Sequence, residues 1–273
     1  MKKFEGILIC TDLDGTLLRT DKSISEQNIK AIEYFKSQGG IFTFITGRMP
    51  KLAKKVYTAV KPNAPIGCIN GSGIYDYDKG EYLWQKPLDK EAVEIVEFLC
   101  EKMENIGFQL VGFEEVYICK ENEEMKSYRA LKDVDTPCCD YKSVEEPLGK
   151  ILLVIGKESE MLRTIELINE HPKADKFSYI RAERTLYEIL PKGVSKGELI
   201  KKIADLLGIE ISKTIAIGDY NNDIAMLKAA GVGIAVANAT KETKAVADFI
   251  TVSNEEDAIA KVIYDLEDGK FGI

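Results

Sequence analysis

Two aspartates at the end of an apolar run are the residues in this sequence best suited to carry out chemistry. Asp12 and Asp14 follow the strand-like residues 7–10 and precede Gly15. Alternate side chains of an extended chain point to the same side, so the two carboxylates are expected to lie together. Paired carboxylates repel each other unless a cation lies between them or one is protonated, which favours a hard divalent metal such as Mg²⁺. A strand that simply ends in a polar Asp-Gly turn is the alternative.

Further clusters of polar residues follow apolar runs or begin helices elsewhere in the chain. They are Thr46-Gly47-Arg48, Ser195-Lys196-Gly197 and Gly218-Asp219-Tyr220-Asn221-Asn222-Asp223. In a doubly wound sheet, the carboxyl ends of the strands converge on one crevice, where ligands bind. Carboxylates, a lysine, a hydroxyl and N–H groups at helix starts suit a metal ion bound together with a phosphoryl group.

The elements that position these clusters follow a strand–helix rhythm in the first part of the chain. Ser23 and Glu26 match a capping box that begins a helix ending at Gly39-Gly40. Apolar runs at 41–45 and 65–69 flank a predicted helix at 50–60 that has a proline in its first turn. This rhythm predicts a parallel sheet. Residues 74–83, centred on Asp78-Lys79-Gly80, then predict a β-hairpin.

The rhythm breaks over residues 87–190, which predict a separate α+β unit. Its predicted helices are 90–106, 122–131 and 159–170, and its predicted strands are 108–111, 116–119, 151–155, 177–181 and 186–190. No element is predicted for 133–149. The rhythm then returns, with strands at 214–217, 232–236 and 249–252 and helices at 197–207, 224–231, 241–247 and 255–266. The sequence therefore predicts one doubly wound α/β domain (residues 1–84 and 191–273), interrupted by an α+β domain (residues 85–190).

Composition limits the class of protein. The 273 residues are 45% hydrophobic and 30% charged, the balance of a soluble globular chain. A net charge of −8 argues against a nucleic-acid partner, but it does not exclude a small phosphorylated substrate. The six cysteines form no CxxC pair, and no apolar stretch reaches the length of a membrane span or a signal peptide. We therefore expect a cytoplasmic protein with no membrane partner.

Taken in order, the four clusters resemble the motifs of the haloacid dehalogenase-like phosphohydrolases, and within them the Cof-like group (subfamily IIB). The family pattern is DxDGT, a Thr or Ser at a strand end, a Lys at a helix start, and GDxxND, and all four occur here in that order. The resemblance covers nearly the whole chain, including the insertion, which in that family is a mobile cap. It implies a Mg²⁺-dependent phosphatase acting on small phosphorylated metabolites, with sugar phosphates as the first expectation.

The resemblance also assigns roles to residues. Asp12 would be the nucleophile and a metal ligand, Asp14 the general acid and base with its backbone carbonyl on the metal, and Asp219 the third protein ligand. The residues expected to hold phosphate are Leu13 through its backbone N–H, Thr46, Gly47, Lys196 and Asn222. Thr16 would tie the loop after Asp14 through a local hydrogen bond, and Asp223 would orient Lys196 or a metal-bound water.

Each of these residues also has a purely structural interpretation. Lys196 could be a surface charge at a helix start, Thr46 a helix N-cap, and residues 221–223 the cap of the following helix. Asn70-Gly71 matches a turn first and a phosphate-side loop second. Arg48 stays open between an exposed charge and a residue facing the substrate entrance. His171, the only histidine, is expected at a helix end rather than as a catalytic base.

The sequence separates some of the reactions known in such folds. A dehalogenase has no use for Asp14, because halide leaves without a proton, and a cation-pumping ATPase needs membrane helices. A phosphomutase and a non-catalytic phosphate-binding regulatory protein stay open as alternatives. Candidate contacts to the leaving group lie near the last strands of the insertion, although surface salt bridges explain them equally well; they are Arg181, Glu183, Arg184 and Glu188.

Overall fold

The computed structural model describes residues 2–132 and 136–273, and the backbone alone at 131–132. The chain forms two compact units. The first consists of the segment ending at Trp84 together with Ser195–Ile273, and the second of Gln85–Val194. Residues 133–135, part of the stretch without a predicted element, lie outside the described residues.

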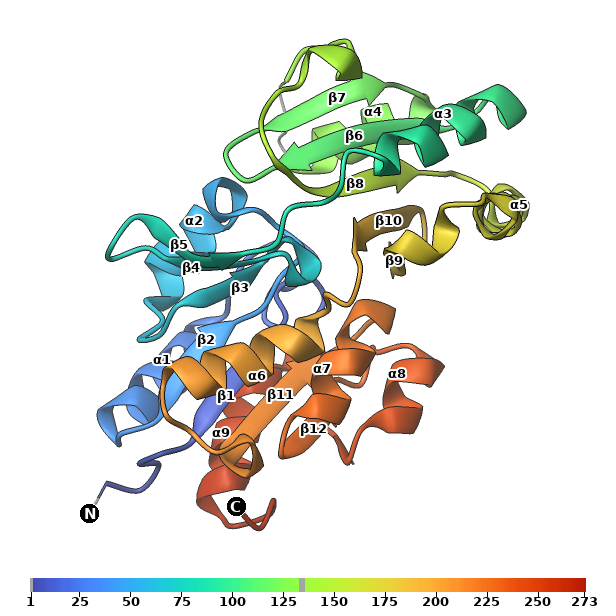
Figure 1. The fold of residues 1–273 in the computed structure, drawn as a ribbon. Coiled ribbons are helices and arrows are strands. Elements are labelled where there is room, and N and C mark those ends of the chain that lie inside the picture. Colours follow the sequence, from blue (N-terminus) through green and yellow to red (C-terminus); the bar gives the residue numbers. More distant parts are fainter. Residues whose placement is uncertain (1, 133–135) are drawn as a thin grey trace. The chain divides into compact units, whose positions relative to one another are not determined.

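A five-stranded parallel sheet forms the centre of the first unit (Figure 1). Its order is β13-β12-β11-β1-β2, and every neighbouring pair is parallel. The strands are β1 (Leu8–Thr11), β2 (Ile41–Phe44), β11 (Thr214–Gly218), β12 (Val232–Ala235) and β13 (Phe249–Ile250). Segments from both ends of the chain therefore pair at the middle of one sheet, with Thr11 of β1 opposite Ile217 of β11.

Helices cover both faces of this sheet (Figure 1). They are α1 (Glu26–Ser37), α2 (Pro50–Val60), α6 (Lys196–Leu206), α7 (Ile224–Ala229), α8 (Lys241–Val246) and α9 (Ala258–Glu267). Helices α6 and α7 pack on Leu8, Cys10 and Ala216, which share one face of the sheet, while α1 and α9 pack together. Burial of this apolar surface on both sides drives the layered arrangement. The prediction of a doubly wound α/β fold is confirmed.

The predicted start of the first helix was wrong by two residues. The N-cap of α1 is Ser25, whose hydroxyl oxygen accepts a hydrogen bond from the Asn28 N–H at 3.0 Å. Ser23 lies in the preceding turn, where its own N–H donates to the Asp21 carboxylate. The capping-box pattern at Ser23 and Glu26 is absent because Glu26 is already the first residue of the helix.

The apolar run at 65–69 does not form one of the five strands of the parallel sheet. It forms β3 (Ile66–Cys68), which pairs antiparallel with β4 (Gly73–Asp76), and β5 (Glu81–Gln85) completes a separate three-stranded sheet. One parallel bridge, Ile45–Gly67, connects β3 to the residue after β2. The hairpin predicted at 74–83 is confirmed. The parallel assignment failed because a short buried strand has the same apolar pattern in both kinds of sheet.

The second unit is an antiparallel sheet in the order β7-β6-β8-β10-β9. Its elements are α3 (Ala92–Lys102), β6 (Gly107–Gly112), β7 (Val116–Lys120), α4 (Glu123–Lys132), β8 (Leu148–Val154), α5 (Glu158–Glu170), β9 (Phe177–Glu183) and β10 (Leu186–Pro191). Helices α3 and α5 cover one face through a core that includes Ile95, Leu99 and Ile151. Every helix and strand predicted for this region is present, with shifted ends. Its use as a cap stays a prediction.

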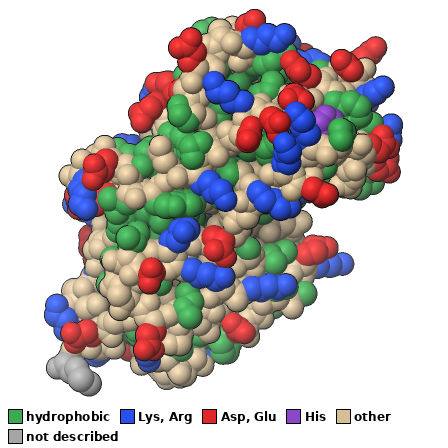
Figure 2. Space-filling view, viewed as in Figure 1, with side chains coloured by type: hydrophobic (Ala, Val, Ile, Leu, Met, Phe, Trp, Pro, Cys, Tyr) green, Lys and Arg blue, Asp and Glu red, His purple; other side chains and the backbone are tan. Residues whose placement is uncertain are grey.

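The surface carries both signs of charge. Figure 2 shows Lys and Arg side chains interspersed with Asp and Glu side chains on the face in view. Among the described residues, no helix has both the length and the apolar character needed to cross a bilayer.

Candidate active site

The first two aspartates of the site stand at neighbouring strand ends. Asp12 follows β1 and donates its N–H to the Ile217 carbonyl at 2.8 Å, which continues the pairing with β11 one residue further. Asp219 follows β11 directly. Because the two strands are parallel and adjacent, the carboxylates that follow them emerge at the same edge of the sheet.

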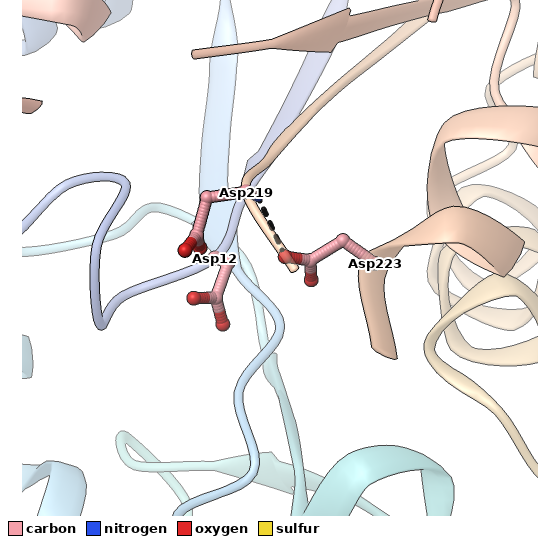
Figure 3. Close-up of side chains that lie close together, drawn as sticks. All are labelled: Asp12, Asp219 and Asp223. Carbon is pink, nitrogen blue, oxygen red and sulfur yellow. Dashed lines mark hydrogen bonds between the residues drawn. The ribbon is translucent and has the colours of Figure 1, made fainter. Parts of the chain in front are cut away.

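Three carboxylates converge at this edge. Side-chain oxygens of Asp12, Asp219 and Asp223 lie within 4.8 Å of one another, and Figure 3 shows the three side chains gathered around one point. The Asp223 carboxylate accepts hydrogen bonds from the N–H groups of Asp219 (2.9 Å) and Tyr220 (3.1 Å), which fold the loop after β11 back on itself. Asp223 therefore binds the backbone of residues 219 and 220, in a capping box with Tyr220 on the turn Asn221–Asp223, and its side chain makes no cap hydrogen bond to α7 itself.

Lys196 provides the positive charge of the cluster. Its Nζ lies 2.5 Å from Asp12 Oδ1 and 2.6 Å from Asp223 Oδ1, and the side chain is only 1% exposed. Lys196 is the first residue of α6, whose N-cap Ser195 accepts a hydrogen bond from the Glu198 N–H. The alternative of a surface charge is therefore wrong for Lys196. The predicted contact between Asp223 and Lys196 is present.

Burial shifts the proton affinities of these groups. Loss of water raises the pKa of Asp12 to about 7, although the Lys196 charge opposes the shift. Burial likewise raises the pKa of Asp219 to about 8, assisted by repulsion from Asp223 and Asp12. Burial lowers the pKa of Lys196, but attraction to the two carboxylates outweighs this, so the pKa lies above its ordinary value. One lysine thus leaves the three acidic groups short of positive charge.

The donor set fits a hard divalent cation. Asp223 uses one oxygen for Lys196 and the other for two backbone N–H groups, so its carboxylate is already engaged. Asp12 and Asp219 are the carboxylates that could hold Mg²⁺, since this cation binds through one or two carboxylates and keeps other positions for water or phosphate.

The loop after Asp12 packs directly on Asp219. Gly15 has φ +84°, and a Cβ at this position would lie 2.5 Å from Asp219 Oδ2, so glycine is required here. The Thr16 hydroxyl donates to Asp219 Oδ1 at 2.9 Å. The two residues are 203 positions apart in the sequence, so this is not the local hydrogen bond expected for Thr16. Leu13 is fully buried, and a role for its backbone N–H in phosphate binding stays a prediction.

Asp14 has partners different from those of Asp12. Arg48 binds it with both arms of the guanidinium, Nε to Oδ2 at 2.8 Å and Nη2 to Oδ1 at 2.7 Å, and Lys22 Nζ lies 2.9 Å from Oδ1. The open question about Arg48 is thereby answered: its side chain binds a carboxylate of the predicted catalytic pair.

Thr46 and Gly47 form a turn held in place from several sides. The Thr46 hydroxyl accepts a hydrogen bond from the Arg48 N–H at 3.2 Å, and Met49, not Thr46, is the N-cap of α2. The Thr46 carbonyl accepts from the Asn70 N–H, and the Arg48 carbonyl accepts from the Ile69 N–H. The N-cap alternative for Thr46 is therefore wrong, and the segment 69–71 lies against this turn.

Asn70 contacts two of the residues expected to hold phosphate, although its Asn-Gly pattern indicates a turn first. Its side chain is 1% exposed, and its Oδ1 accepts a hydrogen bond from Asn222 Nδ2 at 3.2 Å. A Cβ on Gly47 would lie 2.8 Å from Asn70 Nδ2, so the amide lies directly beside the Gly47 backbone. The available signal was an Asn-Gly pair directly after an apolar run, the same placement as the other clusters.

The backbone around Asn70 is strained. Ile69, Asn70 and Gly71 have φ values of 53°, 49° and 127°, and a β-branched residue rarely adopts the first of these. A Cβ on Gly71 would lie 2.6 Å from the Ser195 nitrogen. This turn therefore touches the loops that carry Thr46, Asn222 and Lys196, and such strain persists where surrounding structure enforces it.

Two of the four candidate contacts in the second unit form ion pairs. Arg181 binds Glu158 through two hydrogen bonds of 2.7 and 2.5 Å, and Glu188 forms a buried pair with Lys150 at 2.5 Å. A surface salt bridge thus describes Arg181, whereas the pair of Glu188 is buried, and Glu183 and Arg184 are exposed. His171 ends α5 as its C-cap, as expected.

Comparisons with known proteins give a consistent result. A family model described as haloacid dehalogenase-like hydrolase matches residues 9–263. Two proteins of Bacillus subtilis named 5-amino-6-(5-phospho-D-ribitylamino)uracil phosphatase are similar along almost their whole length: YwtE is 31% identical over 96% of this chain and 99% of its own, and YitU is 29% identical over 94% and 96%. A crystal structure of a haloacid dehalogenase-like hydrolase from Bacteroides thetaiotaomicron superposes with a TM-score of 0.82 at 25% identity, covering 95% of this chain and 99% of that one.

Proposed function

Since this chain belongs to the haloacid dehalogenase-like hydrolases, we propose that it is a Mg²⁺-dependent phosphatase that hydrolyses small phosphorylated metabolites through an aspartyl-phosphate intermediate. The observation that carries the proposal is the contact of the buried Asp12 carboxylate with Lys196, beside Asp219. A carboxylate at a strand end that contacts a lysine and lies beside a second carboxylate, with which it could share a metal, suits attack on phosphorus.

The residues divide the reaction between them. Asp12 attacks phosphorus as the bond from phosphorus to the ester oxygen breaks, and Asp14 gives its proton to that oxygen. Asp14 then takes a proton from water as the water oxygen attacks phosphorus and the bond to Asp12 breaks. The products are the alcohol and phosphate, and both aspartates return to their starting states. When bound by Asp12, Asp219 and the Asp14 carbonyl, Mg²⁺ would offset negative charge on the phosphoryl group.

The remaining site residues hold the phosphoryl group. Lys196 offsets charge that develops on the phosphoryl oxygens, and Asp223 keeps the lysine in place. The hydroxyl of Thr46, the N–H groups of Leu13 and Gly47, and the amide of Asn222 are the donors we assign to phosphate oxygens.

We propose small sugar phosphates and related polyol phosphates as substrates. The relatives YwtE and YitU are named for a substrate in which phosphate is carried by a ribityl chain, which supports this class. Residues 85–190 would serve as the cap over the leaving group, and residues 1–84 with 191–273 as the catalytic core. A cytoplasmic location would provide such metabolites.

Phosphate release from a panel of phosphorylated metabolites, with Mg²⁺ and with EDTA, tests the proposal. We expect release that requires the metal and that falls at least about 10³-fold in Asp12→Asn, because the nucleophile is lost. Asp205→Asn, an exposed carboxylate on α6, is the matched control and should keep wild-type activity. Release that persists in EDTA or in Asp12→Asn contradicts the mechanism.

The two alternatives give different outcomes in the same experiment. A phosphomutase would return phosphate to the sugar and leave little free phosphate. A non-catalytic binding protein would release none from any compound while still binding phosphate in the presence of Mg²⁺.

A further inference from the structure

The two carboxylates of the predicted catalytic pair are one residue apart, yet the structure places them in separate environments. Asp12 faces Lys196 within the buried cluster that also contains Asp219 and Asp223. Asp14 is paired with Arg48, and the side chains of both are 20% exposed. The proposed function requires Asp14 to transfer a proton along a defined direction, so the group that fixes its orientation matters for the reaction.

The contact between Arg48 and Asp14 has the geometry that fixes a carboxylate. Nε and Nη2 of the guanidinium each donate to a different carboxylate oxygen, at 2.8 and 2.7 Å. Two parallel hydrogen bonds from a planar donor hold the carboxylate plane as well as its position, which a single bond does not. Oδ1 also accepts from Lys22, so we assign the proton transfer to Oδ2, which takes one of the two Arg48 hydrogen bonds.

The backbone of Arg48 is itself anchored. Its N–H donates to the Thr46 hydroxyl at 3.2 Å, and its carbonyl accepts from the Ile69 N–H at 3.0 Å. The guanidinium therefore extends from the same turn that carries the Thr46 and Gly47 donors assigned to phosphate. Lys22 also contacts Asp14 at 2.9 Å, but its side chain is 45% exposed and offers one point of contact.

We propose that Arg48 is a positioning residue for Asp14, setting the direction in which that carboxylate exchanges its proton with the leaving oxygen and with water. This inference rests on the proposed phosphatase function. It predicts that loss of Arg48 slows the steps in which Asp14 transfers a proton and leaves the other steps unchanged.

Esters with different leaving groups separate this role from others. An alkyl phosphate needs a proton on its leaving oxygen, whereas p-nitrophenyl phosphate releases a stable anion without one. In Arg48→Met we expect kcat/KM for the alkyl ester to fall roughly 10- to 100-fold and kcat/KM for the aryl ester to change by less than about 3-fold. Turnover of both esters slows, because water attack on the aspartyl phosphate still needs Asp14, and a burst of nitrophenolate appears.

Further variants identify the route of the effect. Arg48→Lys keeps the charge without the bidentate contact, and its kcat/KM for the alkyl ester should lie between those of wild type and Arg48→Met. In an Asp14→Asn background, adding Arg48→Met should lower kcat/KM for the alkyl ester no further, since the group through which Arg48 acts is already altered. Arg19→Met removes another arginine–aspartate pair of the same unit, to Asp257, and should keep wild-type kinetics; melting temperatures of all variants report folding.

Each result has a clear meaning. If Arg48→Met lowers kcat/KM equally for the two esters, or lowers kcat/KM for the alkyl ester further in the Asp14→Asn background, Arg48 binds substrate or supports the fold. Either result would overturn the proposal. A wild-type protein that releases phosphate from neither ester would instead contradict the proposed function.

Discussion

At the scale of single residues, the site depends on amide and carboxylate groups whose partners are far away in the sequence. Asn70 joins Asn222, 152 positions later, and lies against Gly47. Its left-handed backbone is tolerated by asparagine better than by most residues. One residue thus fixes the relation between two loops assigned to phosphate.

Substitution of Asn70 should separate the role of the amide from that of the backbone. Asn70→Gly keeps the left-handed conformation but removes the amide, and we expect kcat/KM to fall roughly 10- to 100-fold because Asn222 and Gly47 lose their common neighbour. Asn70→Ala should show the same kinetic loss plus about 1 kcal/mol of destabilisation from the unfavourable φ. Steady-state kinetics and thermal unfolding measure the two effects.

A matched control exists for this prediction. Lys61 is also left-handed, with φ 50°, and ends α2. Lys61→Gly should therefore keep wild-type kinetics. Wild-type kcat/KM in Asn70→Gly would refute the role assigned to the amide.

At the scale of elements, helix α6 delivers Lys196 to the carboxylates. Lys196 is the first helical residue, so its position depends on where the helix begins, and the Ser195 hydroxyl fixes that start by accepting the Glu198 N–H at 3.2 Å. Gly197 allows close packing, because a Cβ there would lie 2.4 Å from the Ala225 carbonyl oxygen at α7. The start of α6 is thus held by its cap and by its neighbour.

Loss of the cap should affect both stability and catalysis. We expect Ser195→Ala to lower the free energy of unfolding by about 1 kcal/mol and also to lower kcat, because Lys196 is no longer fixed against Asp12. Ser25→Ala removes the equivalent cap from α1, which carries no predicted catalytic residue, and should cost similar stability without a loss of kcat. Denaturant unfolding and steady-state kinetics on both variants provide the comparison. Equal kcat in the two variants would disprove a catalytic role for the start of α6.

At the scale of the whole molecule, the buried carboxylates make stability depend on pH. The folded protein raises the pKa of Asp12 from 3.8 to about 7 and that of Asp219 to about 8. Between these values and 3.8 the folded state binds more protons than the unfolded state, so the free energy of unfolding falls as pH rises. The stabilisation is complete below the ordinary aspartate pKa and is lost as pH passes 7 to 8.

Thermal unfolding in EDTA should show this dependence. We expect the metal-free protein to lose several kcal/mol between pH 5 and pH 8, because both carboxyl groups lose their protons in this range. Mg²⁺ should raise the melting temperature more at pH 8 than at pH 5, because at low pH it competes with protons for the same oxygens. In the double variant Asp12→Asn, Asp219→Asn, the free energy of unfolding should depend less on pH, and Mg²⁺ should raise the melting temperature less. A metal-free protein whose stability rises over this range would contradict the assignment of the raised pKa values.

The amino-acid pattern alone predicts much of this molecule because its signals are local. Apolar runs, caps and glycines predict most helices and strands, and the order of four motifs predicts the family, which the comparisons confirm. The mistakes have local causes too: Ser23 and Ser25 are both possible caps, and a short strand such as β3 looks alike in parallel and antiparallel sheets.

What the sequence by itself determined is therefore the set of elements and the chemical types at their ends. Only the tertiary structure decided that Thr16 binds Asp219, that Asp14 pairs with Arg48, and that Asn70 bridges two loops. The physical reason is that these contacts link residues far apart in the chain, and their positions follow from how the sheet and its helices pack. Local propensity carries no information about which distant side chain will meet another.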